Sequence, residues 1–240
     1  MTIADKFQAI AENEQKVYDK GYSDGAAQGG GGSYDQGFED GKQAQLDQFW
    51  NDKTNNFAKT DYKYAFYSSN YTNLFPPPKV IKPKDATNMF YSCRAESTEN
   101  FDFSLCTNFS YAFGAAEIKN IGMVDFSSAT ATTAPFYACK AESISIRGIS
   151  HITSLSSWFG YCNVKEFRIE GDIPVSCSFS NATSLSHDSI VNIVNALSAT
   201  ASGQTLTLSK TAVNNAFGSK DSAEWQALIA PKTQWSFSLV

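Results

Sequence analysis

Asn88-Met-Phe-Tyr-Ser-Cys93 is the first of a series of related segments, followed by Tyr111-Ala-Phe-Gly-Ala-Ala116, Ala134-Pro-Phe-Tyr-Ala-Cys139 and Ser157-Trp-Phe-Gly-Tyr-Cys162. Each segment has a phenylalanine at its third position, and consecutive phenylalanines lie 23 residues apart. A small residue, Cys or Ala, ends each segment. The chain between residues 88 and 173 is therefore a repeat with a fixed period.

Apolar residues also recur eight and ten positions after the last three phenylalanines. These pairs are Ile121 and Met123, Ile144 and Ile146, and Phe167 and Ile169. With the apolar position three residues earlier, each unit reads apolar-x-x-apolar-x-apolar, and a period near 23 with this core is a leucine-rich-repeat pattern. One unit buries too little to fold alone, but stacked units pair their strands into one parallel sheet.

The sequence thus predicts an α/β fold, a leucine-rich-repeat-like solenoid of about four to five repeats of 23 residues with an N-terminal helical segment and a small C-terminal cap. The first repeat fits less well, because Thr98 and Asn100 occupy the two apolar positions while Phe101 and Phe103 lie just beyond them. We expect a slip or bulge near the start of the stack, since terminal repeats are usually atypical.

Composition divides the rest of the chain into further segments. Residues 1–57 carry an amphipathic stripe (Ile3, Phe7, Ile10, Val17) and a glycine-rich joint, and we expect helices that anchor the protein or make it oligomeric. Residues 58–87 form an aromatic N-terminal cap and a proline-rich connector, residues 88–184 the solenoid, and residues 185–240 a C-terminal cap. The aromatic residues between 60 and 71 either close the open end of the stack or bind a carbohydrate or a protein partner.

Within 185–240, residues 189–197 have helical apolar spacing behind Asp188, and residues 205–208 alternate as a strand. Residues 212–217 and 222–229 suggest further helical turns, and residues 235–240 again read as a strand.

The formal net charge of −5 gives no electrostatic footprint for nucleic acid. The N-terminal residues do not resemble a signal peptide, and no apolar stretch is long enough to span a membrane. The five cysteines are an odd number, and Ala116 stands in for a cysteine in their column, so we expect buried, reduced thiols rather than a disulfide framework.

Motifs for chemistry are missing from the sequence. Its two histidines, His151 and His187, have no metal-ligand spacing around them, and there is no P-loop, Rossmann glycine pattern or G-x-S-x-G motif. We therefore expect no cofactor, no metal and no enzymatic activity. A glycosidase would need two carboxylates brought together by the fold, and that alternative stays open.

A solenoid instead offers a continuous exposed strand face, formed by the residues between the apolar positions. This face is either a contact surface for a partner or a solvated array of cross-strand charge pairs. Its candidate binding residues are Lys119, Asn120, Ser143, Ser145, Arg147, Lys165, Glu166, Arg168 and Glu170.

The Asn88–Cys93 unit with its 23-residue period resembles the BspA-like leucine-rich repeats. The segments Met1–Glu14, Phe49-Trp50, Asp61–Phe66, Leu185–Leu197 and Gln204–Leu208 extend the likeness, because they resemble a family of phage- and prophage-encoded proteins from Gram-positive gut bacteria. The likeness covers nearly the whole chain. The glycine-rich duplication in residues 18–41 departs from that family, so the attachment of the N-terminus is not carried over.

The resemblance implies a non-enzymatic, virion-associated structural protein, often a tail accessory protein, whose repeats form a receptor-binding or adhesion surface. It would be made in the host cytoplasm and would contact other virion proteins through its N-terminal helices, as a homo-oligomer, and a host surface glycan or protein through its repeats. The first alternative is a bacterial cell-surface adhesin with the same solenoid. The second is a glycan-degrading enzyme.

Overall fold

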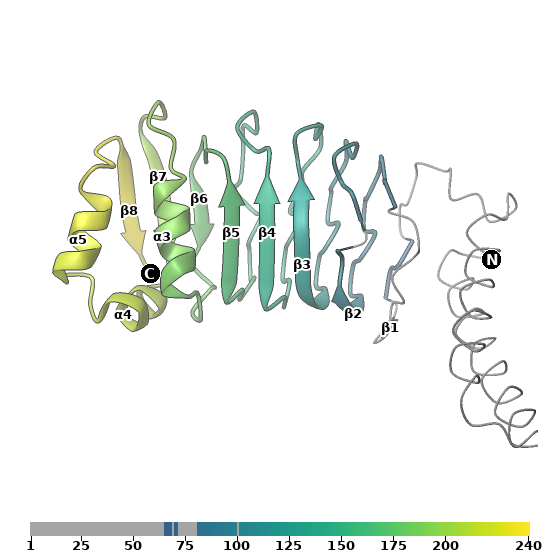
Figure 1. Ribbon diagram of the computed structural model, residues 1–240, viewed down its shortest axis with the longest axis horizontal. Coiled ribbons are helices and arrows are strands. Elements are labelled where there is room, and N and C mark those ends of the chain that lie inside the picture. The colour runs from purple at the N-terminus through teal and green to yellow at the C-terminus, as the bar shows by residue number, and fades with distance from the viewer. Residues whose placement is uncertain (1–64, 69, 72–80, 100) are drawn as a thin grey trace, which may run out of the picture. The chain divides into compact units, whose positions relative to one another are not determined.

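The computed structural model describes residues 65–68, 70–71, 81–99 and 101–240, and nearly all of them belong to one compact unit made of Thr60–Leu74 and Lys82–Val240. This unit is a mixed α/β structure with two sheets of parallel strands, and the described strands close no barrel (Figure 1). The first sheet has the order β1 (Asn70–Tyr71), β2 (Arg94–Ser97), β3 (Glu117–Asp125), β4 (Ser143–Arg147) and β5 (Glu166–Glu170).

The 23-residue period sets the register of this sheet. Arg94 pairs with Glu117, Asn120 with Ser143, and Ser143 with Glu166, each partner lying 23 residues further along the chain. The inward residues of β4 and β5 are almost fully buried and the residues between them point to solvent. Alternation along each strand thus separates a core face from a polar face.

The repeated phenylalanines stack along the core. The centroids of consecutive rings lie 5.1 Å (Phe66–Phe90), 5.4 Å (Phe90–Phe113), 5.3 Å (Phe113–Phe136) and 5.6 Å (Phe136–Phe159) apart. The two rings of each pair are within 10° of parallel. Stacked aromatic pairs of this kind stabilise a fold by about 0.5–1.5 kcal/mol each beyond the area they bury. Phe66, from the aromatic segment before the repeats, extends this stack by one ring. Tyr62 and Tyr64 lie outside the described residues.

The predicted slip lies in two units rather than one. A bulge at Gly122 shifts the register between β3 and β4, so Val124, not Met123, fills the core position opposite Ile146. Val124 is fully buried, whereas Met123 is partly exposed, and the assignment of Met123 to the core is therefore wrong. The bulge adds one residue before the last core position of the unit. Phe101 lies 23 residues before Val124 and is also buried, so the first two units both contain this extra residue.

The cysteines form part of the same core. Cys93, Ala116, Cys139 and Cys162 are all fully buried at equivalent positions of successive units, and the structure has no disulfide among the described residues. Burial raises the pKa of the Cys93 thiol to about 12. Small side chains are required here because the neighbouring phenylalanine stack fills the interior.

Beyond β5 a helix replaces the strand of the repeated unit, and a second sheet begins. The helix α3 (His187–Asn195) lies beside β5 where the next strand of the first sheet would be (Figure 1). Phe179 stacks on Phe159, with the ring centroids 4.5 Å apart, and so continues the phenylalanine stack. It belongs to the first strand of the second sheet. That sheet has the order β6 (Cys177–Phe179), β7 (Gln204–Leu208) and β8 (Trp235–Leu239), with α4 (Lys210–Phe217) and α5 (Ala223–Ile229) between the last two strands.

The helices and strands expected in 185–240 are all present, each within a few residues of its predicted bounds. Serines begin the three helices, with Ser186, Ser209 and Ser222 each accepting a hydrogen bond from a backbone N–H of the first turn. No helix in the described part of the chain is long and apolar enough to cross a membrane.

Candidate functional site

All nine residues predicted for the exposed face lie on the polar side of the first sheet or at its rim. Lys119, Arg147, Lys165, Glu166, Arg168 and Glu170 are exposed, and Asn120, Ser143 and Ser145 are partly exposed. The strand register places Asn120, Ser143 and Glu166 in one row across the sheet, and Arg147 and Glu170 in another.

Several of these side chains pair with a side chain of the neighbouring strand. Lys119 Nζ lies 2.9 Å from Glu96 Oε1, and Arg147 Nε donates to Asp125 Oδ2 at 2.8 Å. Ser143 Oγ donates to Asn120 Oδ1 at 2.7 Å. The part of the face that spans β2, β3 and β4 therefore carries satisfied cross-strand pairs, of the kind that stabilises a sheet by about 0.2–1 kcal/mol per pair.

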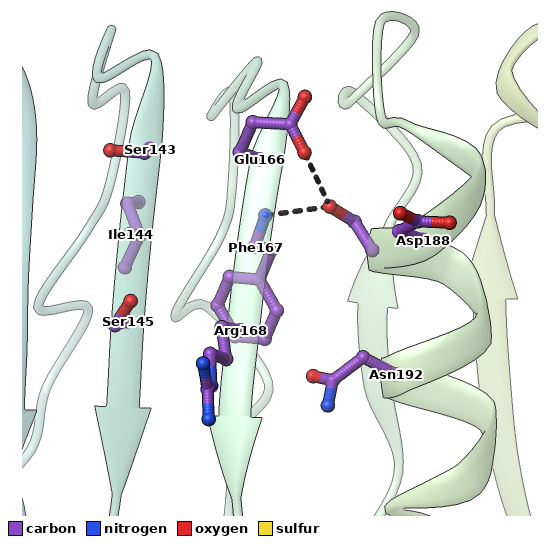
Figure 2. Close-up of a pocket in the computed structure, with 9 residues that line it drawn as sticks. Ser143, Ile144, Ser145, Glu166, Phe167, Arg168, Asp188 and Asn192 are labelled. Atoms are coloured by element: carbon purple, nitrogen blue, oxygen red, sulfur yellow. Dashed lines mark hydrogen bonds between the residues drawn. The ribbon is translucent and has the colours of Figure 1, made fainter.

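A groove of about 340 Å³ opens at the other end of the face, between β4, β5 and α3. A helix with its side chains is roughly 10 Å wide, about twice the spacing of strands, so α3 rises above the sheet as a wall. The strands β4 and β5 form the floor of the groove. The exposed-face side chains of β4, Ser143 and Ser145, are small and leave space beside α3 (Figure 2). The lining residues are Ser143, Ile144, Ser145, Glu166, Phe167, Arg168, Asp188, Ser189 and Asn192.

Two side chains of α3 take the place of a sixth strand. Ser189 Oγ accepts a hydrogen bond from Phe167 N at 2.8 Å, and Asn192 Oδ1 accepts one from Ile169 N at 2.7 Å. Asn192 Nδ2 also donates to Ile169 O at 3.3 Å. These bonds satisfy the edge of β5, which would otherwise leave backbone groups unpaired. The wall of the groove is thus fixed to its floor.

Glu166 is held in a fixed orientation at one end of the groove. Its Oε2 accepts a hydrogen bond from Ser186 Oγ at 2.6 Å. It also accepts one from Ser189 Oγ at 3.3 Å (Figure 2). Lys165 Nζ approaches its other oxygen at 4.0 Å. Because two hydroxyl groups donate to the Glu166 carboxylate, its negative charge stands at a defined point of the groove.

Two further charged groups line the groove. Arg168 lies further along β5 and its Nη2 contacts Glu170 Oε1 at 3.3 Å. Asp188 projects from the first turn of α3 with its side chain 97% exposed, and His187 Nδ1 lies 3.1 Å from its Oδ1. Hydrogen bonds to Asp188 and to Glu224 raise the pKa of His187 above its ordinary value. The carboxylates of Glu166 and Asp188 outnumber the single guanidinium.

The sequence located four of these lining residues, Ser143, Ser145, Glu166 and Arg168. It missed Asp188, Ser189 and Asn192, because residues 185–197 read as part of a cap. A signal was available: Asn192 lies 23 residues after Ile169 and so occupies an apolar strand position of the repeat with a polar side chain. The remaining predicted residues, Lys119, Asn120, Arg147, Lys165 and Glu170, lie outside the groove.

The donor set of the groove suits hydrogen bonding and charge pairing. Its two carboxylates come from different elements, β5 and α3 (Figure 2). Among the residues that the structure describes, no three His, Cys, Asp or Glu side chains come together as a metal site. No protein-family model, curated protein or solved structure matches this chain.

Proposed function

We propose that the stacked units are a leucine-rich-repeat solenoid of the BspA-like kind, and that the protein is a non-enzymatic component of a phage virion. Its exposed strand face is a contact surface for a host cell or for a neighbouring virion protein. The N-terminal residues 1–57 attach it to the particle as an oligomer.

The observation that carries this proposal is the groove beside α3. It is a hollow in the polar face, lined by exposed charged side chains that their neighbours hold in place and by the partly exposed Ser145. Arg168 and Asp188 are 68% and 97% exposed, so a partner reaches them without any rearrangement. The bonds from Ser189 and Asn192 keep both sides of the groove in place, which lowers the entropic cost of binding.

Two observations bear on the alternatives. Glu166 and Asp188 both line one groove, which is the arrangement a glycan-degrading enzyme would need. Asp188, however, stands almost fully in solvent, where a carboxyl group lacks the enclosed surroundings that tune a catalytic acid. An adhesin would use the same face, and detection of the protein in purified particles separates it from a virion component.

Blocking the groove tests the contact surface. Ser145 is partly exposed on the floor, so Ser145→Arg would fill the groove while leaving the core face of β4 unchanged. Ser236→Arg is the matched control, because Ser236 is an exposed strand residue of the second sheet. We expect Ser145→Arg, but not Ser236→Arg, to lose binding of the labelled protein to host cells or to purified particles. Equal binding by both variants would overturn the proposal.

Attachment is tested separately, by light scattering coupled to size exclusion. We expect the full chain to be an oligomer and a 60–240 fragment to be a monomer. We also expect deletion of residues 1–57 to abolish incorporation into particles, and unchanged incorporation would refute the anchoring role.

A further inference from the structure

The three helices of the C-terminal cap lie together (Figure 1) and meet at one imidazole ring. His187 is the first residue of α3, and its ring centroid lies 4.7 Å from that of Phe217, the last residue of α4. Its Nε2 lies 2.8 Å from Oε1 of Glu224, in the first turn of α5. Its Nδ1 lies 3.1 Å from Oδ1 of Asp188, the next residue of α3. One side chain therefore joins α3 to both other helices.

The two carboxylate contacts require a protonated ring. A neutral imidazole carries a hydrogen on one nitrogen only, whereas the imidazolium carries one on each. The ionised side chains of Asp188 and Glu224 only accept hydrogen bonds. His187 therefore donates to both carboxylates at once only as the imidazolium. Hydrogen bonds to Asp188 and then to Glu224 raise the pKa of His187 above its ordinary 6.5, which agrees with this geometry.

The charges that face the ring are both negative. Asp188 comes from α3 and Glu224 from α5, while α4 contributes the uncharged ring of Phe217. Lys220, in the connection between α4 and α5, pairs with Asp221 at 2.6 Å. In the part of the chain that the structure describes, no lysine or arginine forms an ion pair with Asp188 or Glu224. The imidazolium is thus the cation that offsets these two carboxylates.

The helix α5 has few other contacts with the rest of the protein. Trp225 is the buried one of its seven residues, and its ring lies 5.4 Å from that of Phe217 and 6.0 Å from that of Phe237. The hydrogen bond from Gln226 Nε2 to Lys220 O stays within the local chain. Elements that bury little apolar surface open locally at low free energy. A contact that joins α5 to α3 should therefore change how often α5 opens.

We propose that His187 makes the attachment of α5 to α3 dependent on pH. With the imidazolium in place, Asp188 and Glu224 are both paired and α5 is held against α3. When the ring loses its proton, one hydrogen bond and the offsetting charge are lost, and α5 opens more often. Because the folded pKa is raised, this stabilisation is complete below the unfolded value of about 6.5 and is lost as the pH rises through the folded pKa.

Titration of the two histidine rings of the full chain by NMR, from about pH 5 to about pH 9, tests the protonation. His151 is the internal reference, because it lies in the repeats, where its Nε2 meets Ala129 O. We expect a midpoint above 6.5 for His187. We also expect Glu224→Gln to lower that midpoint and to leave that of His151 unchanged. A His187 midpoint at or below 6.5, or one that Glu224→Gln does not lower, would overturn the proposal.

Hydrogen exchange measures the attachment of α5 itself. The quantity compared is the protection of the α5 backbone amides, corrected for the intrinsic dependence of exchange on pH. His187 is 40% exposed, so its contacts are screened by water as in an exposed ion pair. We expect the protection of α5 to fall about two- to fivefold as the pH rises across the His187 midpoint, while that of β4 stays constant.

Three variants assign this pH dependence to His187. His187→Gln and Glu224→Gln remove the titrating contact, so the protection of α5 should not vary with pH in either variant. Glu224→Gln also removes an acidic residue from the first turn of α5, which weakens the helix at every pH, so the comparison is of the slopes with pH. Asp221→Asn is the matched control, because Asp221 is an exposed carboxylate that pairs with Lys220, and it should keep the wild-type slope.

Two results would contradict the pH-dependent attachment. If the protection of α5 in the wild type is constant across the His187 midpoint, the proton does not affect the attachment. If His187→Gln keeps the wild-type slope, another group controls the opening of α5.

Discussion

The side chain of Asn192 holds the backbone of Ile169 at two points. Its Oδ1 accepts a hydrogen bond from Ile169 N at 2.7 Å and its Nδ2 donates one to Ile169 O at 3.3 Å. A single amide on a helix thus reproduces the donor and acceptor that a neighbouring strand would supply. Together with Ser189, it ends the first sheet at β5 and forms the wall of the groove.

Asn192→Ala should therefore destabilise the protein. The substitution leaves Ile169 N without its partner at a partly buried position, and an unsatisfied amide costs about 1–3 kcal/mol. Urea unfolding measures the loss, and hydrogen exchange should show faster exchange at Ile169. Asn195→Ala is the control, because Asn195 ends the same helix with an exposed side chain. The strand-mimic role is refuted if Asn195→Ala costs as much as Asn192→Ala.

Gly148 and Gly171 form a natural comparison, since they lie 23 residues apart with φ of 75° and 99°. A Cβ on Gly148 would lie 2.6 Å from Ser127 N and 3.0 Å from Asp125 Oδ1, whereas a Cβ on Gly171 meets nothing within 4 Å. We expect Gly171→Ala to cost about 1 kcal/mol from its backbone conformation alone. Gly148→Ala should cost clearly more, because rigid backbone must move. Equal unfolding free energies for the two variants would contradict this account.

The fold was predictable where the 23-residue spacing of similar side chains continued without interruption. Phe90, Phe113, Phe136 and Phe159 fix both the stack of rings and, through their spacing, the strand register. The position of the bulge was not predictable to the residue, because Met123 and Val124 are both apolar and only packing against Ile146 decides which is buried.

The groove was half predictable, for a different physical reason. Ser143, Ser145, Glu166 and Arg168 alternate with buried residues, so their exposure follows from strand periodicity. The wall depends on where α3 packs. Ile190, Ile193 and Val194 predict a helix, but helical spacing carries no information on which neighbouring edge its Ser189 and Asn192 side chains reach.

The cysteines should be chemically inert in the folded protein. Burial raises the pKa of Cys93, Cys106 and Cys177 to about 12, and a hydrogen bond with Cys139 followed by burial raises that of Cys162. Because the thiolate is the reactive form, we expect no reaction with a disulfide reagent near neutral pH until denaturant is added. Five thiols should then titrate. Rapid reaction of one or more thiols in the native protein would contradict the burial of all five cysteines.

Cys139→Ala should be tolerated, since Ala116 fills the equivalent position one unit earlier. We expect it to cost about 1 kcal/mol, because only a small buried group is lost. Cys139→Leu should cost more, about 1–3 kcal/mol, because the extra volume has no space beside the phenylalanine stack. Thermal unfolding of the two variants distinguishes a requirement for small size from a requirement for sulfur. If Cys139→Ala is the more damaging of the two, sulfur rather than size matters.

Acid should remove the stabilisation that Asp102 provides. A hydrogen bond from Ser104, together with Lys82 at 2.9 Å, lowers the pKa of Asp102 from its ordinary 3.8 to about 2. Since the folded pKa lies below the unfolded one, the contribution is complete above about pH 4 and disappears as the pH falls toward 2.

Asp102→Asn should cost about 1–2 kcal/mol near neutral pH, after allowance for the partial exposure of the pair. The difference between wild type and variant should shrink in acid, as urea unfolding from pH 7 to pH 2 would show. Asp172→Asn, at an exposed position, is the control. If the free energies of unfolding of the wild type and Asp102→Asn differ by the same amount at every pH in this range, Asp102 acts through packing rather than charge.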